Sequence, residues 1–157
     1  MGKKKPTKGD HNLHIPNKKA LFDYELLEEY MAGLVLKGTE VKAIRMGKVN
    51  LKDSFCFFKN NELWVKGMHI SHYQEGGIDN HDPTRPRKIL LHKRELRKLQ
   101  KAKEEKRLTI IPKNIFLNNK GLIKMRIALA KGKKAYDKRA TIKDRDLARE
   151  QARNTLT

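Results

Sequence analysis

The sequence of 157 residues has one cysteine, Cys56, which excludes a disulfide framework and most cysteine-ligated metal centres. Three phenylalanines at positions 55, 57 and 58 surround it, which predicts a thiol packed in the core. No hydrophobic run reaches the ~18 residues that a membrane-spanning helix needs. The basic start MGKKKPTKGD is not followed by the apolar segment of a secretory signal. These absences predict a cytosolic protein with no membrane partner.

Acidic residues are also scarce relative to basic ones. The chain has 37 Lys and Arg against 18 Asp and Glu, for a net charge of +19. The excess lies in the first 19 residues and in the second half, whereas residues 20–84 are slightly acidic. Such a balance predicts binding to nucleic acid or another anionic surface. A disordered basic protein or a histone would lack the regular apolar alternation found further along the chain.

Few residues suggest catalysis or metal binding. The sequence has no phosphate-binding glycine loop, and its His-x-x-His pairs at 11/14 and 69/72 lack a third defined ligand. Asp79, His81 and Asp82 cluster in a loop and could hold a divalent ion for a nuclease, but their spacing matches no hydrolytic pattern. We therefore predict no enzyme, no cofactor and no metal site, with a metal-dependent nuclease as an alternative.

Hydrophobic spacing predicts several short strands. Residues 123–130 alternate apolar and polar or small side chains, which is typical of a half-buried strand. Ser54–Phe58 and Leu63–Val65, joined by four polar residues, predict a hairpin. Residues 108–117 predict a strand that Pro112 interrupts, which places that position at an edge or a bulge.

Helices are predicted at 40–46, between a Thr39 cap and Gly47, and at 92–106, with Leu96 and Leu99 facing inward. Residues 22–36 fit a helix slightly better than a strand, and 74–86 predict a loop. Short strands with two or three helices indicate a small antiparallel barrel with outer helices. It would span residues 17–130, between a mobile basic N-terminus (1–16) and a basic tail (131–157).

The tail has too few apolar side chains to pack on a core, so we expect it to be loose in isolation. Arg145, Arg149 and Arg153 recur at every fourth residue and would share one face of a helix, where a polyanion would turn their repulsion into attraction. The tail is therefore predicted to be helical on nucleic acid, although a solvated tail without a function is the alternative. Three further basic segments (17–19, 40–45 and 85–88) favour RNA binding.

Four motifs carry a resemblance to a known family. They are NKKALFDY (17–24), GTEVKAIRMGKVNLKDS (38–54), DPTRPRKILLHKREL (82–96) and GKKAYDKRATIKDRD (132–146). In these motifs the sequence resembles the small protein B (SmpB) family, the bacterial tmRNA-binding proteins of trans-translation. It departs from the family where Ala43 replaces a usual Ser, Met31 a common Glu and Arg107 a frequent Gly. In the family this Glu is associated with RNA binding, and that role is not transferred to Met31.

The resemblance implies a mainly β fold, an antiparallel OB-like barrel with about three outer helices, and it makes 22–36 a strand. It also implies that the barrel grips the tRNA-like domain of tmRNA. Together with the basic segments, it selects eight RNA-binding residues: Asn17, Lys18, Glu40, Lys42, Arg45, Arg87, Lys88 and Leu90.

The family's tail enters the decoding centre and the empty mRNA channel of the small ribosomal subunit, so that stalled ribosomes are rescued and the nascent peptide is tagged. The tail residues assigned to this role are Lys131, Gly132, Lys133, Lys134, Tyr136, Asp137, Lys138, Arg139, Lys143, Arg145, Arg149 and Arg153. Tyr136 is suited to stacking on a base, and Gly132 is predicted as a flexible joint. The chain would act as a monomer, with elongation factor Tu and GTP engaged indirectly through alanyl-tmRNA. The competing hypothesis is a ribosomal or assembly protein whose barrel and tail bind one RNA together.

Overall fold

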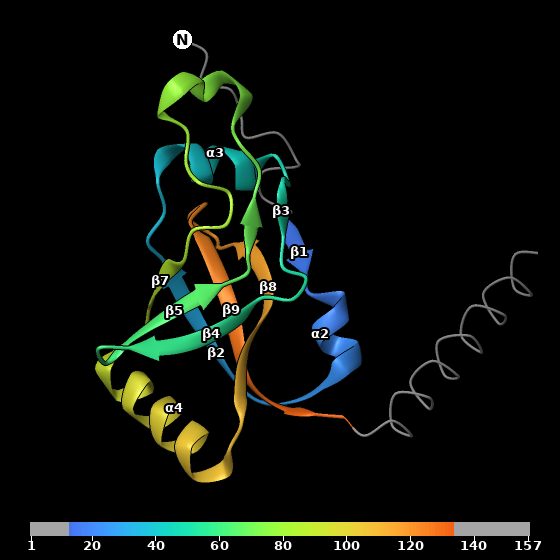
Figure 1. Ribbon diagram of the computed structural model, residues 1–157, viewed down its shortest axis with the longest axis vertical. Helices are drawn as coiled ribbons and strands as arrows, with labels where there is room; N and C mark the ends of the chain where they lie inside the picture. The colour runs from blue at the N-terminus through green and yellow to red at the C-terminus, as the bar shows by residue number, and fades with distance from the viewer. Residues whose placement is uncertain (1–12, 134–157) are drawn as a thin grey trace, which may run out of the picture.

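A closed ring of antiparallel strands forms the centre of this computed structural model, which describes residues 13–133 (Figure 1). In ring order the strands are β8 (Thr109–Leu117), β4 (Phe55–Lys59), β5 (Glu62–Lys66), β7 (Arg87–Leu90), β2 (Tyr24–Leu34) and β9 (Ile123–Gly132). The ring closes because β9 pairs with both β2 and β8. The predicted antiparallel barrel is therefore confirmed.

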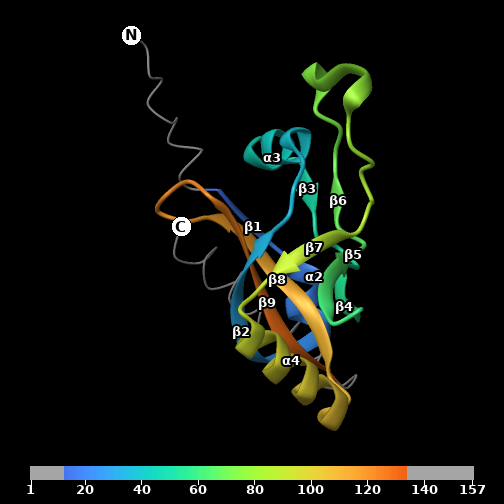
Figure 2. The same cartoon turned by 90° about the vertical axis from the view of Figure 1, so that its left-hand side faces the viewer.

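Within residues 13–133, three short strands and three α-helices surround this ring. Strand β1 (His14–Pro16) extends the sheet beside β8, and β3 (Val49–Asn50) pairs with β6 (His69–Ile70). The helices are α2 (Lys18–Asp23), α3 (Gly38–Arg45) and α4 (Lys93–Lys106), with a 3-10 helix at Gln74–Asp79. Figures 1 and 2 both place α3 and α4 at opposite ends of the barrel, with α2 at its side.

The main core fills the inside of the ring. Alternate residues of β9, namely Met125, Ile127 and Leu129, point into it and are at most 2% exposed. Leu99 of α4 and Ile44 of α3 are 0% exposed and add to the same cluster from the two helices. Cys56 is buried there as well, as predicted, and its burial raises the pKa of the thiol.

Residues 127–130 of β9 are buried on both faces of the strand, which differs from the half-buried strand predicted there. Ala130 packs with Ala20 and Ile111 in a second small cluster. Ala20 belongs to α2, so this helix covers the outer face of the barrel at that point. The alternation in the sequence could not reveal α2, because a helix of six residues is too short to show a helical period.

Several local predictions are confirmed. The β4–β5 hairpin turns at Asn60 and Asn61, whose φ angles of 52° and 61° suit a two-residue hairpin loop. The pairing of β8 with β9 shifts register between Pro112 and Asn114, at the bulge that the proline predicted. Residues 24–34 form a strand, as the family resemblance implied and against the slight helical preference of their spacing.

Other predictions need correction. Residues 14–16 were expected to be mobile, but they form β1 and pair with β8. Helix α3 begins at Gly38 and its N-cap is Lys37 rather than Thr39. The predicted loop at 74–86 contains a 3-10 helix. The remaining N-terminal residues (1–12) and positions 134–157 lie outside the described residues.

Candidate RNA-binding face

A buried ion-pair network fixes helix α3 on the barrel. Glu40 lies in the first turn of α3, and its Oε1 accepts a hydrogen bond of 2.8 Å from the backbone N–H of Lys37. Its Oε2 accepts one of 2.6 Å from Nε of Arg87 on β7, and Arg85 donates to Oε1. Glu40 and Arg87 are both 0% exposed. The helix is thereby tied to a strand that lies 47 positions further along the chain.

Arg87 uses its remaining donors on backbone carbonyls. Its Nη1 donates to Met68 O at 2.6 Å, and its Nη2 donates to Asp82 O and Pro83 O at 3.2 and 3.0 Å. The predicted direct contact of Glu40 or Arg87 with RNA does not fit this burial. Instead, the two side chains hold α3, β7 and the segment between β6 and β7 together.

The charge state of Glu40 follows from its partners. Burial alone would raise the pKa of its carboxyl, but hydrogen bonds from Arg85, the Lys37 amide and Arg87 outweigh this effect and lower the pKa below its usual value. The network therefore holds an ionised carboxylate against two guanidinium groups.

His81 also serves the structure rather than a metal. It is 1% exposed, and its ring nitrogens lie 2.9 Å from Thr39 Oγ1 and 2.9 Å from Ile70 O. Asp82, its neighbour, accepts hydrogen bonds from the backbone and hydroxyl of Thr84. His81 cannot bind an ion without losing one of its hydrogen bonds, and residues 13–133 contain no cluster of three potential metal ligands. The hypothesis of a nuclease site at Asp79, His81 and Asp82 thus finds no support.

Basic side chains of α3 lie on the surface that the network supports. Arg45 is exposed, and its Nη2 donates to Gly121 O at 3.0 Å. Lys42 is also exposed, and its ammonium lies 5.2 Å from the centre of the Tyr73 ring. Both predicted RNA-binding residues are therefore accessible, and Arg45 is held in place by the turn between β8 and β9.

A shallow groove of about 280 Å³ lies beside Arg45. Leu90 of β7 and Leu122 of the β8–β9 turn, which line it, are 48% and 53% exposed. Lys124 lines the same groove, whereas Lys88, two residues before Leu90, lies opposite Trp64 of β5 and is 38% exposed. Cationic and apolar groups thus meet along one surface, which suits phosphates beside bases or sugars.

The basic surface continues along β9, in residues that were not predicted as binding residues. Arg126 lies opposite Met31 of β2, which is 54% exposed. Its guanidinium lies 4.6 Å from the centre of the Phe116 ring on β8. The alternation of 123–130 already placed Lys124 and Arg126 on the outer face of this strand, so this pattern could have identified them. We define the RNA face as Met31, Lys42, Arg45, Leu90, Leu122, Lys124 and Arg126.

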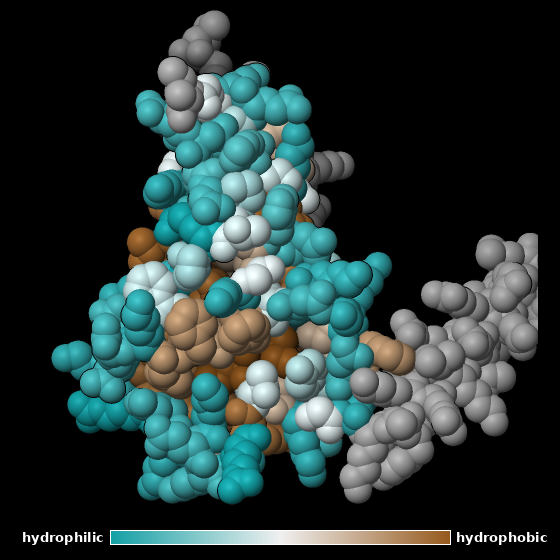
Figure 3. All heavy atoms as spheres, in the orientation of Figure 1, coloured by the Kyte–Doolittle hydropathy of each residue, from teal (hydrophilic) through white to brown (hydrophobic). Residues whose placement is uncertain are grey.

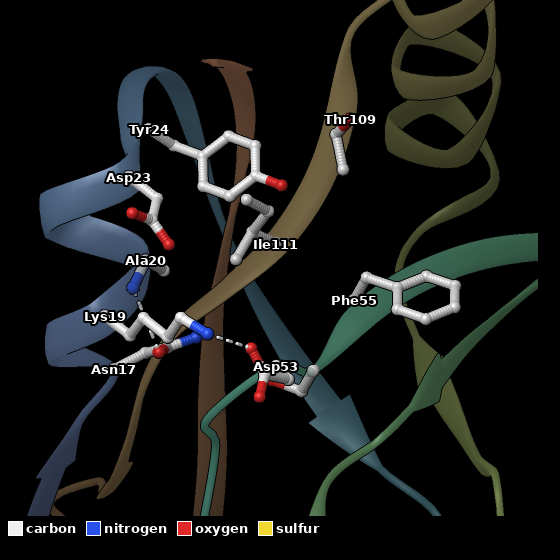
Figure 4. Close-up of a pocket in the computed structure, with 10 residues that line it drawn as sticks. Asn17, Lys19, Ala20, Asp23, Tyr24, Asp53, Phe55, Thr109 and Ile111 are labelled. Carbon is white, nitrogen blue, oxygen red and sulfur yellow. Dashed lines mark hydrogen bonds and ion pairs between the residues drawn. The ribbon is translucent and has the colours of Figure 1, made fainter. Parts of the chain in front are cut away.

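Asn17 has a structural place beside helix α2 (Figure 4). It is 3% exposed and caps α2, accepting a hydrogen bond from Ala20 N at 3.3 Å. Its Nδ2 donates to Pro112 O at 2.9 Å, which ties the helix to the bulge of β8. A direct RNA contact of Asn17 therefore does not fit, whereas Lys18 is exposed at the start of the helix. The adjacent Lys19 forms an ion pair of 2.6 Å with Asp53.

The first three residues assigned to the tail belong to the barrel. Gly132 pairs with Tyr24 as the last residue of β9. The backbone N–H of Lys133 donates to Asp23 O at 2.9 Å, and its Nζ donates to Leu21 O at 3.2 Å. The predicted joint at Gly132 is thus a paired strand residue. The other predicted tail residues lie outside the described part: Lys134, Tyr136, Asp137, Lys138, Arg139, Lys143, Arg145, Arg149 and Arg153.

Comparison with known proteins agrees with the resemblance noted in the sequence. The family model described as SmpB protein matches residues 14–157. The chain belongs to the SmpB family. SmpB proteins are RNA-binding proteins without enzymatic activity, in agreement with the prediction that this chain is not an enzyme. No helix among residues 13–133 is both long and apolar enough to cross a membrane.

Individual SmpB relatives match over most of their length. The SsrA-binding protein of Cytophaga hutchinsonii is 56% identical over 142 residues, which are 90% of this chain and 93% of the relative. That of Bacteroides thetaiotaomicron is 52% identical over 142 residues, 90% of this chain and 95% of the relative. A chain from a solved structure described as "tmRNA-SmpB: a journey to the center of the bacterial ribosome" has a TM-score of 0.66 and 47% identity. The match covers 78% of this chain and 86% of that one.

Proposed function

We propose that the RNA face defined above is the surface through which this chain holds tmRNA. As an SmpB protein, the chain binds SsrA RNA (tmRNA) and acts in trans-translation, the rescue of stalled ribosomes. The observation that carries the assignment of the face is the placement of Lys42 and Arg45. Both are exposed on a helix that the buried Glu40–Arg87 pair fixes, beside a groove lined by Leu90, Leu122 and Lys124.

The chemistry of this face suits the tRNA-like domain of tmRNA. Arg45, Lys124 and Arg126 supply cations to phosphates, and the exposed leucines supply apolar contacts to sugars or unstacked bases. Arg45 is oriented by Gly121 O, and Arg126 by the Phe116 ring, so less side-chain entropy is lost on binding. Glu40, Arg87 and Asn17 support this function by fixing α3 and α2.

The tail has a separate role in this proposal. It enters the decoding centre and the vacant mRNA channel of the small subunit, where RNA phosphates attract its arginines and allow it to order. When mRNA fills the channel, the tail cannot bind, so only stalled ribosomes are selected. The chain acts as a monomer in the bacterial cytoplasm, and elongation factor Tu with GTP engages it indirectly through alanyl-tmRNA.

The deciding experiment compares the full chain with a 1–133 truncation. This end point preserves the pairing of Gly132 with Tyr24 and the contacts of Lys133, which a truncation at 130 would remove. We expect tmRNA affinity to stay within about twofold, whereas peptide tagging on ribosomes stalled at a cut message is lost. Full tagging by the truncated chain would refute the role of the tail. A severe loss of tmRNA affinity would instead favour an RNA-binding protein whose barrel and tail act on one RNA.

A further inference from the structure

The outer face of the β4–β5 hairpin carries aromatic side chains outside the RNA face. Cys56 points into the core, so Phe55 and Phe57 on either side of it point outward. Their ring centroids are 6.3 Å apart, and Phe55 is 42% exposed. Trp64 of β5 lies directly opposite Phe57. Figure 3 shows apolar residues gathered over β4, with hydrophilic residues around them.

A hollow of about 390 Å³ lies on this hairpin, large enough for a nucleobase. Phe57, Trp64 and Pro86 form its apolar lining, and Asn60 and Lys59 contribute polar groups. The indole Nε1 of Trp64 is shielded from solvent and has no hydrogen-bond partner within the described residues. Because this nitrogen is shielded, the aromatic faces and the polar side chains of Lys59 and Asn60 are the groups that the lining offers to a ligand.

The border of this hollow is mainly cationic. Lys88 of β7 lies opposite Trp64, and Lys66 of β5 lies opposite Phe55. Glu62 is the one acid lining the hollow, and its carboxylate lies 3.4 Å from Nζ of Lys88. Aromatic faces bordered by lysines favour a single-stranded polyanion whose bases stack, over a peptide or a duplex.

We propose that this surface is a stacking site for an unpaired RNA base, held against Phe57 and Trp64 with its flanking phosphates on Lys66 and Lys88. Strands β4 and β5 lie across the ring from β2 and β9, which carry part of the RNA face. The two surfaces can therefore hold different RNA segments at once. The stacking site does not depend on the proposed role of the RNA face.

The chain itself supplies the probe for a test, because Trp64 is its only tryptophan. Titration of the full-length protein with a short unstructured oligoadenylate RNA should quench the Trp64 fluorescence to saturation. A duplex RNA of the same length should not quench it at the same concentrations. Phe57→Leu removes the stacking surface but keeps an apolar side chain, and should weaken this binding by about tenfold. Leu27→Ala, at an exposed apolar position of β2 outside both surfaces, is the control and should leave the quenching unchanged.

Failure of this site is distinguishable from failure of the RNA face, because tmRNA affinity is measured separately on the same variants. Absence of quenching, equal affinity of Phe57→Leu and the native chain, or equal quenching by duplex would overturn the proposal. Normal RNA binding by Phe57→Leu together with defective tagging would assign this face to a protein partner instead. If Phe57→Leu does not fold, Lys66→Ala with Lys88→Ala provides the same test. This double substitution on the surface should reduce both the affinity for the oligoadenylate RNA and its salt dependence. Unchanged values would equally overturn the proposal.

Discussion

Nε of Arg87 lies 2.6 Å from Oε2 of Glu40, and neither side chain is exposed to solvent. A buried ion pair of this kind gives little net stability relative to an apolar pair, because both charges lose their hydration. Loss of one partner is costly, however, since the other charge remains buried without compensation. The pair therefore serves mainly to set where α3 lies, and with it Lys42 and Arg45.

Glu40→Ala should lower the free energy of unfolding by about 3–5 kcal/mol, because it leaves Arg87 unpaired in the interior. Urea denaturation measures this change. Glu29→Ala is the matched control, since the Glu29–Lys113 pair has the same length of 2.6 Å but is 40% and 30% exposed. That control should cost less than about 1 kcal/mol. Similar losses for the two variants would contradict the structural role of Glu40.

The same carboxyl should make stability depend on acid pH. Its pKa is lower in the folded protein than the ordinary value of 4.5, so the unfolded state takes up the proton first as pH falls. The contribution of Glu40 is fully present above pH 4.5 and is lost as pH falls from there through its lower folded pKa. Unfolding free energies measured between neutral and acid pH should fall less steeply in Glu40→Gln than in the native chain. Parallel profiles would show that other groups carry the dependence.

Arg45→Ala and Lys42→Ala should each weaken tmRNA binding several-fold at physiological salt. Each should also make the slope of log affinity against log salt concentration shallower by about one, because one fewer counterion is released on binding. Filter binding at several salt concentrations measures both effects. Arg97→Ala and Lys101→Ala remove the same charges from exposed positions of α4, at the other end of the barrel (Figure 2). If these controls weaken binding as much, only the total charge matters and the assigned face is wrong.

Asn17→Ala should destabilise the protein by about 1–2 kcal/mol, because it removes the cap of α2 and the bond to Pro112 O. Thermal melting measures the loss. Since Asn17 is buried, its tmRNA affinity should be near normal at temperatures where the variant stays folded. Asn17→Asp keeps the cap and should recover part of the stability. A folded Asn17→Ala protein with severely reduced affinity would restore Asn17 as a contact residue.

The parts of the fold that follow from local chemistry were predictable from the sequence. The alternation of 123–130, the proline at 112 and the two asparagines at 60 and 61 each constrain the backbone at their own position. Periodicity alone could not assign β2, since its apolar spacing fits both the helical and the strand period. The family resemblance favoured the strand.

The candidate site was harder to predict because charge does not reveal burial. Glu40 and Arg87 are charged residues in basic segments, and a solvated position is the ordinary expectation for both. Their partners lie tens of residues away, so only the closed barrel brings them together. Asn17 was likewise predicted to contact RNA, but it is buried. Lys42, Arg45 and Leu90 are exposed, as their assigned role requires.

The ring closes at β9, which pairs with β2 along one edge and with β8 along the other. Strand β9 is the last strand of the barrel to be synthesised, so a nascent chain that ends between Leu117 and Ile123 contains the other five ring strands but lacks the one that closes the ring. A ribosome that halts while making this very protein would release an open and inactive fragment. Incomplete copies therefore cannot compete with finished ones for the RNA that rescues their own synthesis.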